Sequence, residues 1–84
     1  MRKRIKDAAT AAFRDNSKLS NMAAEDRETA AQFYEEIAGN TIGTSADLAR
    51  LYNLERARFL RGEIPRIAST ARGFAQTIEH SGEV

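Results

Sequence analysis

Residues 20–39 read SNMAAEDRETAAQFYEEIAG, and this stretch decides the fold class. Its apolar residues recur at the three- and four-residue spacing of an amphipathic helix. They are Met22, Ala30, Phe33 and Ile37. Ser20 or Asn21 suits the N-cap, and Gly39 stands where a left-handed C-terminal residue is expected. The pattern therefore predicts a helix over residues 20–38.

The same periodicity appears in three further stretches of the chain. In one of them, Leu48, Leu51, Tyr52 and Phe59 fall on one face, and Gly62 follows where the helix is expected to end. Residues that favour helices dominate the composition, while β-branched and aromatic residues are scarce. We predict an all-α, compact bundle of three to four helices. Their expected ranges are about 3–15, 20–38, 45–61 and 65–80.

The chain has 84 residues and a mass of 9.3 kDa, which predicts a single small helical domain over residues 1–84. Residues 1–6 and 81–84 are expected to be flexible. Many positions of the apolar stripes are Ala, and Ala buries little area per residue. A core of this kind has a thin stability margin, so self-association as a homodimer, or another protein partner, would help the chain fold.

The chain lacks the residues that most catalytic sites need. The chain has no Cys and one His, His80, so thiolate and His-rich metal sites are excluded. Gly39 and Gly43 do not have the spacing of a phosphate-binding loop, and no Lys follows them. Glu35 and Glu36 are adjacent and diverge on a helix. We therefore expect no catalytic residue, no metal, no cofactor, no small-molecule substrate and no enzymatic activity.

No apolar run is long enough for a secretory signal or a membrane span. The expected location is the cytoplasm, without a membrane partner. The bias toward Ala and Arg suits a GC-rich bacterial or phage gene.

Charge is segregated along the chain. Residues 1–18 carry six basic and two acidic side chains, whereas residues 19–49 carry one arginine against six carboxylates. Residues 50–72 again hold six arginines against two carboxylates. Either oppositely charged helices face one another within the bundle, or the blocks form an interaction surface.

The leading hypothesis is a small non-enzymatic protein–protein interaction or regulatory protein. It rests on the missing catalytic residues, the Ala-rich core and the charge blocks. One candidate binding surface is the acidic run, and a second is formed by the arginines of residues 50–61. The acidic run comprises Glu25, Asp26, Glu28, Glu35 and Glu36.

An alternative comes from residues 45–62, which read SADLARLYNLERARFLRG. Leu48, Ala49, Tyr52, Asn53 and Leu54 follow in the order of a helix-turn-helix. The stretch resembles that motif of small bacterial and phage DNA-binding proteins. Asn53 stands in for the glycine of the turn. The next apolar position falls on Gly62, however, and Glu55 would lie beside the phosphates.

This resemblance implies a DNA-binding transcriptional regulator with residues 55–61 as its recognition helix. The basic residues near the N-terminus would form an arm that tracks the DNA backbone. The candidate DNA contacts are Arg50, Arg56, Arg58, Arg61, Arg2 and Arg4. The competing interpretation of the same residues is one uninterrupted amphipathic helix over residues 45–61.

Overall fold

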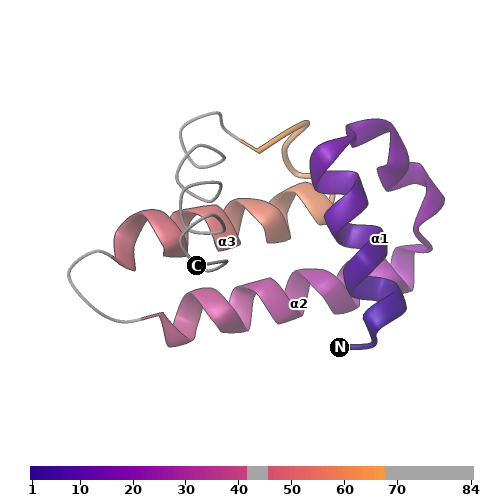
Figure 1. The fold of residues 1–84 in the computed structure, drawn as a ribbon. Helices are drawn as coiled ribbons and strands as arrows, with labels where there is room; N and C mark the ends of the chain where they lie inside the picture. The colour runs from indigo at the N-terminus through magenta and orange to yellow at the C-terminus, as the bar shows by residue number, and fades with distance from the viewer. Residues whose placement is uncertain (42–45, 68–84) are drawn as a thin grey trace, which may run out of the picture.

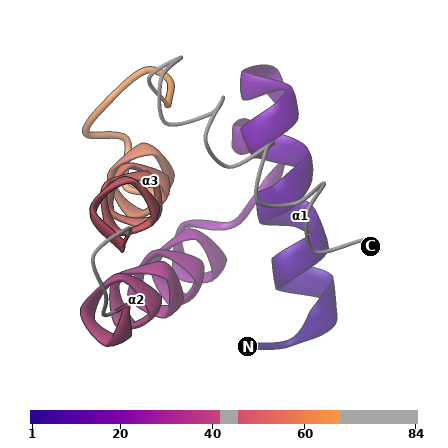
Figure 2. The same ribbon diagram turned by 60° about the vertical axis from the view of Figure 1, so that its left-hand side comes forward.

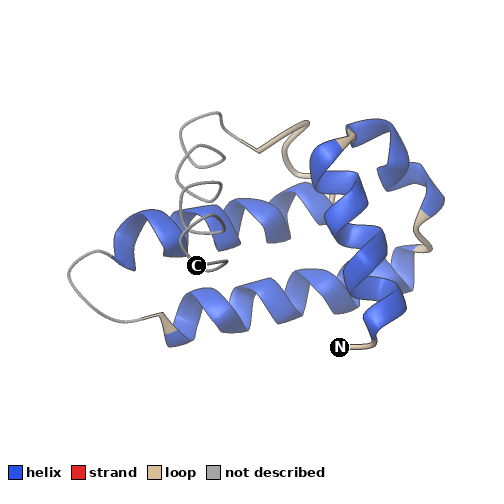
Figure 3. Ribbon diagram, in the orientation of Figure 1, coloured by secondary structure: helices blue, strands red, loops and turns tan. Residues whose placement is uncertain are grey.

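The computed structural model describes residues 1–41 and 46–67. In this part of the chain the elements are α-helices and one 3-10 helix, and no strand is present, which confirms the all-α prediction (Figure 3). The α-helices are α1 (Lys3–Arg14), α2 (Ala24–Asn40) and α3 (Ala46–Leu60), and the 3-10 helix η1 is Asn16–Asn21. None of the described helices combines the length and the apolar character needed to cross a membrane.

Helices α2 and α3 lie side by side and run in opposite directions (Figure 1). Helix α1 crosses this pair at the end where α2 begins and α3 ends, as Figure 2 shows from the side. The core where the three helices meet contains the rings of Phe13, Tyr34 and Phe59. Around these rings, the buried alanines Ala9, Ala12, Ala30, Ala31 and Ala57 allow the helices to approach closely.

Helix α2 begins later than the sequence predicts. Ser20 and Asn21 belong to η1 and do not cap α2. Asp15 caps η1 instead, because its carboxylate accepts from the backbone N–H of Ser17 at 3.1 Å and from its hydroxyl at 2.7 Å. The chain is then extended at Met22, which is buried, and α2 starts after Ala23 without a side-chain cap.

Of the two glycines predicted to end a helix, only Gly62 does so. Gly39 lies inside α2, which continues to Asn40, so its assignment as a left-handed cap is wrong. Gly62 does terminate α3, with φ at 79°. Its N–H donates to the Phe59 carbonyl at 3.0 Å, and the Glu63 N–H donates to the Arg58 carbonyl at 2.9 Å. This pair of bonds is a Schellman motif.

The turn required by the helix-turn-helix interpretation is not formed. Helix α3 is continuous through Asn53, where no positive φ occurs, and the Asn53 amide donates to the Ala49 carbonyl at 3.0 Å. No Gly or Pro interrupts residues 46–60, so helical hydrogen bonding continues through this stretch. The interpretation as one uninterrupted helix is confirmed over Ala46–Leu60.

The first residues of the chain are helical, whereas residues 65–67 are not. Residues 3–6 form the first turn of α1. Pro65, Arg66 and Ile67 are irregular, so no helix begins at Pro65, and Ile67 is buried against the core. The remainder of the predicted fourth helix, residues 68–80, and the expected flexible end, residues 81–84, lie outside the described residues.

Candidate interaction surface on helix α3

The inner side of α3 is built around Arg56. Its guanidinium carbon lies 3.9 Å from the ring centre of Tyr52, 5.0 Å from that of Phe13 and 5.1 Å from that of Tyr34. Arg56 Nη2 also donates to the Tyr52 hydroxyl at 2.6 Å. Three aromatic rings around one cation give a favourable electrostatic contact inside the bundle. Arg56 is therefore directed toward α1 and α2, away from the outer surface of α3.

Tyr34 belongs to the same aromatic cluster. Its ring packs edge-on against two phenylalanine rings, with its centre 5.4 Å from that of Phe13 and 5.2 Å from that of Phe33. Burial raises the pKa of the Tyr34 phenol above its ordinary value of 10.0, and the nearby charge of Arg56 opposes this to a lesser degree. The phenol is thus held in its neutral form as part of the core.

Arg61, directly after α3, binds two carboxylates of α2. Its Nε and Nη2 donate to the two oxygens of Glu28 at 3.0 and 2.8 Å, and Nη2 also lies 2.6 Å from Glu35 Oε1. Hydrogen bonds from Arg61 hold the pKa values of both carboxyls below their ordinary value. In return, these bonds raise the pKa of Arg61. The contacts join the end of α3 to the side of α2.

A second arginine, on α2, also joins α2 to the end of α3. Arg27 Nε, on α2, donates to the carbonyl of Leu60 at 2.7 Å. This carbonyl belongs to the last turn of α3, where no helical N–H remains to satisfy it. The positive charge also suits the negative end of the helix dipole.

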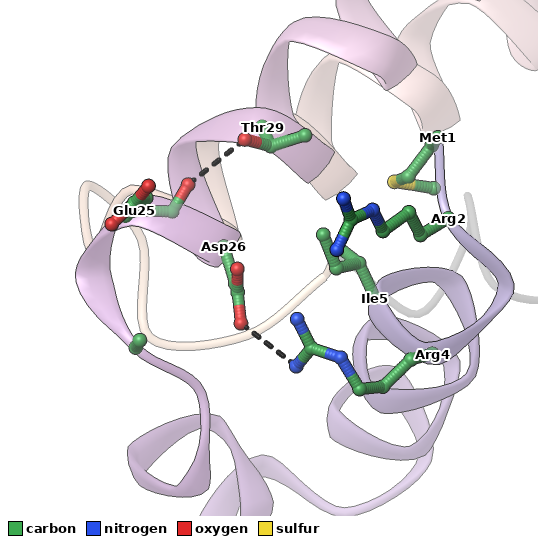
Figure 4. Close-up of a pocket in the computed structure, with 8 residues that line it drawn as sticks. Met1, Arg2, Arg4, Ile5, Glu25, Asp26 and Thr29 are labelled. Carbon is green, nitrogen blue, oxygen red and sulfur yellow. Dashed lines mark hydrogen bonds and ion pairs between the residues drawn. The ribbon is translucent and has the colours of Figure 1, made fainter.

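Acidic and basic groups also meet at the N-terminal ends of α1 and α2. Arg4 Nη1 lies 3.1 Å from Asp26 Oδ2, and the two side chains point toward one another across an open pocket (Figure 4). Arg2, Glu25 and Thr29 line the same pocket. Positive and negative groups share this lining, so the pocket has no single sign of charge.

Three of the five carboxylates in the predicted acidic surface form ion pairs within the chain. Asp26, Glu28 and Glu35 each bind an arginine of the same chain, while Glu25 and Glu36 are exposed. The first interpretation of the charge blocks, that oppositely charged segments face one another, describes these three carboxylates.

The predicted DNA-contacting arginines of residues 50–61 each have a contact within the chain. Arg50 donates to Asp47 at 3.0 Å and to the Thr41 carbonyl at 2.7 Å. Arg58 lies 3.9 Å from Glu63, Arg61 binds α2, and Arg56 is directed inward. The arginines near the N-terminus lie at the pocket of Figure 4.

The outer side of α3 carries three leucines. Leu48, Leu51 and Leu54 are 41, 45 and 40 % exposed. The sequence pattern predicts that Leu48, Leu51, Tyr52 and Phe59 share one apolar face, but the structure exposes the two leucines and buries Phe59. Phe59 and Leu60 are buried and Tyr52 is half-buried, so α3 presents a different side to the core.

We call this outer side the leucine face and define it by Leu48, Leu51 and Leu54 with the charged residues Asp47 and Arg58. Asp47 stands one turn before Leu51, and Arg58 one turn after Leu54. The side chain of Asp47 is 89 % exposed and that of Arg58 is 57 % exposed. The three-residue spacing of Leu48, Leu51 and Leu54 is visible in the sequence, but it does not say which side of α3 faces the core.

Among the described residues, no group of three or more His, Asp or Glu side chains could hold a metal ion. Comparisons with protein-family models, with curated proteins and with solved structures found no match to this chain.

Proposed function

We propose that the protein is a non-enzymatic interaction or regulatory protein that binds another protein surface through the leucine face of α3. The observation that carries the proposal is the exposure of Leu48, Leu51 and Leu54 along one side of a single helix. Single exposed leucines are common, whereas a contiguous row on one helix is typical of a surface that is covered in a complex.

Exposure of these leucines to water is unfavourable, and a partner surface would remove it. Burial of apolar surface contributes about 25 cal/mol per Å², so covering three leucines supplies a substantial driving force for association. Leu48, Leu51 and Leu54 follow at three-residue intervals, and a helix that presents apolar side chains along one side in this way fits a groove or another helix. Ala would satisfy the helix at these positions equally well, so local structure gives no reason for leucine there.

The acidic run has less support as the binding surface. Asp26, Glu28 and Glu35 already have arginine partners, so a basic ligand would compete with these ion pairs. The DNA-binding alternative also has less support, because Arg56 is enclosed by aromatic rings and Arg61 is bound to two carboxylates.

A photo-crosslinking amino acid tests the proposal. It is placed at position 51, within the leucine face, and at the exposed position 36 of α2 as the matched control. Both variants are irradiated as purified protein and in an extract of the source cells. We expect a discrete adduct at position 51, weakened by Leu48→Lys, and none at position 36. Equal labelling at both positions, or no adduct at position 51, would contradict the proposal.

A further inference from the structure

We infer that the leucine face binds a second copy of this chain, with the two α3 helices antiparallel across a two-fold axis. The inference rests on the proposed function, because it names the occupant of the same surface.

The order of residues on the leucine face is self-complementary. Asp47, Leu51, Leu54 and Arg58 follow at intervals of four, three and four residues. Reversing the helix therefore returns apolar positions to apolar positions and exchanges the acidic end with the basic end. When two copies are centred midway between Leu51 and Leu54, each Leu51 meets the Leu54 of the second copy. Asp47 then meets Arg58 of the second copy, twice in the dimer.

The spacing also fits the geometry of helix pairs. Alternation of four and three residues places side chains along a narrow seam, as in two-stranded coiled coils. Helices that pack along such a seam cross at roughly 20°. Leu48 lies beside the seam and widens its apolar surface. An isologous contact of this kind closes as a dimer and leaves no free copy of the surface.

Charge selects the antiparallel orientation over the parallel one. A parallel pair would place Asp47 against Asp47 and Arg58 against Arg58, and like charges opposed in this way are unfavourable. Both side chains have contacts within the chain, Asp47 with Arg50 at 3.0 Å and Arg58 with Glu63 at 3.9 Å. These are exposed surface pairs, which contribute little, so they do not prevent a new pair across the dimer.

The size of the contact sets the expected affinity. Helix α3 has 15 residues and so is about 22 Å long at 1.5 Å per residue. A pair of helices of this length buries less than the 1,200–2,000 Å² or so of a standard stable interface. We therefore expect a weak dimer in rapid exchange, with a dissociation constant on the order of tens of micromolar.

Sedimentation equilibrium of the full chain over about 5–500 µM measures this association. The wild type is expected to pass from 9.3 kDa toward twice that mass as concentration rises. Asp47→Arg and Arg58→Glu should each weaken the dimer at least about tenfold, because each opposes like charges at both ends. The double variant should recover most of the lost affinity, since it restores both pairs with reversed sign.

Controls separate this effect from net charge and from folding. Asp7→Arg and Lys6→Glu make the same changes in charge at exposed positions of α1 and should leave the dimer unchanged. Recovery in the double variant could not follow from unfolding, because two destabilising changes would add.

Orientation is tested with introduced cysteines, since the chain has none of its own. Asp47→Cys and Arg58→Cys, mixed under oxidising conditions, should form a disulfide-linked pair of one copy of each. Neither variant alone should cross-link efficiently, because equal positions are about 16 Å apart along antiparallel helices. Efficient self-linkage of Asp47→Cys would overturn the antiparallel arrangement.

The outcomes distinguish the inference from the proposed function. A chain that stays at 9.3 kDa at every concentration, or a dimer indifferent to the charge reversals, overturns the inference. If position 51 then gives an adduct with a different protein, the proposed function stands with another occupant. If position 51 gives no adduct of any mass, both fail.

Discussion

The guanidinium of Arg56 lies 3.9 Å from the ring centre of Tyr52, one turn earlier on the same helix, and donates to its hydroxyl at 2.6 Å. Both side chains lie on the side of α3 that faces the bundle. With Arg56 and Tyr52 turned inward beside Phe13 and Tyr34, the opposite side of the helix is left to solvent. The enclosed cation and the exposed leucines are thus two consequences of one rotation of α3.

Substitution of Arg56 tests its structural role. Arg56→Ala should lower the free energy of unfolding by about 1–3 kcal/mol, because it removes the contacts with three rings and the bond to Tyr52. Arg58→Ala is the matched control, since it makes the same change two residues later at an exposed position. It should alter stability by less than about 0.5 kcal/mol. Urea unfolding followed by circular dichroism measures both, and equal values would contradict the assignment.

Gly39, inside α2, and Gly62, directly after α3, should respond to alanine substitution in opposite directions. Gly62→Ala should destabilise the protein by about 1 kcal/mol, because φ is +79° and the added Cβ would lie 3.3 Å from Arg27 Nη2. Gly39→Ala should stabilise it by about 0.5–1 kcal/mol, since Gly39 is helical and nothing lies within 4 Å of the new Cβ. Thermal unfolding of the two variants is the measurement. A stabilising Gly62→Ala would mean that the chain does not end α3 in this way.

Stability should depend on pH through Arg61. Its hydrogen bonds lower the pKa of Glu28 and Glu35 below the ordinary value of 4.5 in the folded chain. The folded state therefore favours the ionised carboxylates, and their contribution is present above pH 4.5 and is lost as pH falls through the lowered values. Arg61→Met should flatten the decline of the melting temperature below that pH.

Two controls accompany this pH experiment: a change of salt concentration, and the separate titration of Asp15. Both carboxylates are on the surface, so the difference between wild type and Arg61→Met should shrink at high salt. An acid dependence remains in both proteins, because hydrogen bonds from Ser17 lower the pKa of Asp15 independently of Arg61. Parallel curves for the two proteins would show that the contacts of Arg61 do not couple to folding.

The sequence predicts the helices better than their ends. Periodicity alone places the three α-helices of residues 1–41 and 46–67, because their apolar positions recur over several turns. The start of α2 is misplaced because Ser20 and Asn21 carry the side chains of an N-cap, while the bond from Ser17 to Asp15 begins a different helix before them. Gly39 shows the same ambiguity, since a glycine near a helix end is tolerated inside it as well.

The candidate site could be predicted only in part, because it depends on how α3 is rotated. Leu48, Leu51 and Tyr52 are compatible with one stripe on a helical wheel, and hydrophobicity alone favours the leucines as core. The structure instead turns a half-buried arginine, Arg56, toward the aromatic rings of the core, although sequence patterns assign arginine to the surface. Its aromatic partners come from α1 and α2 as well as α3, and their convergence is a tertiary property that no local spacing reveals.

A salt titration of DNA binding tests the alternative function. With Arg56 enclosed and Arg61 bound to Glu28 and Glu35, we expect at most weak, sequence-independent binding. Such binding should vanish between about 50 and 200 mM salt, because it depends on release of counterions. Fluorescence anisotropy with a labelled duplex and with an unrelated duplex measures it, with Arg58→Ala as the variant at an exposed arginine of α3. Affinity that persists at the higher salt, differs between the duplexes and falls with Arg58→Ala would replace the proposed function with DNA recognition. In that case the outer face of α3 would have to serve a nucleic acid despite its three leucines.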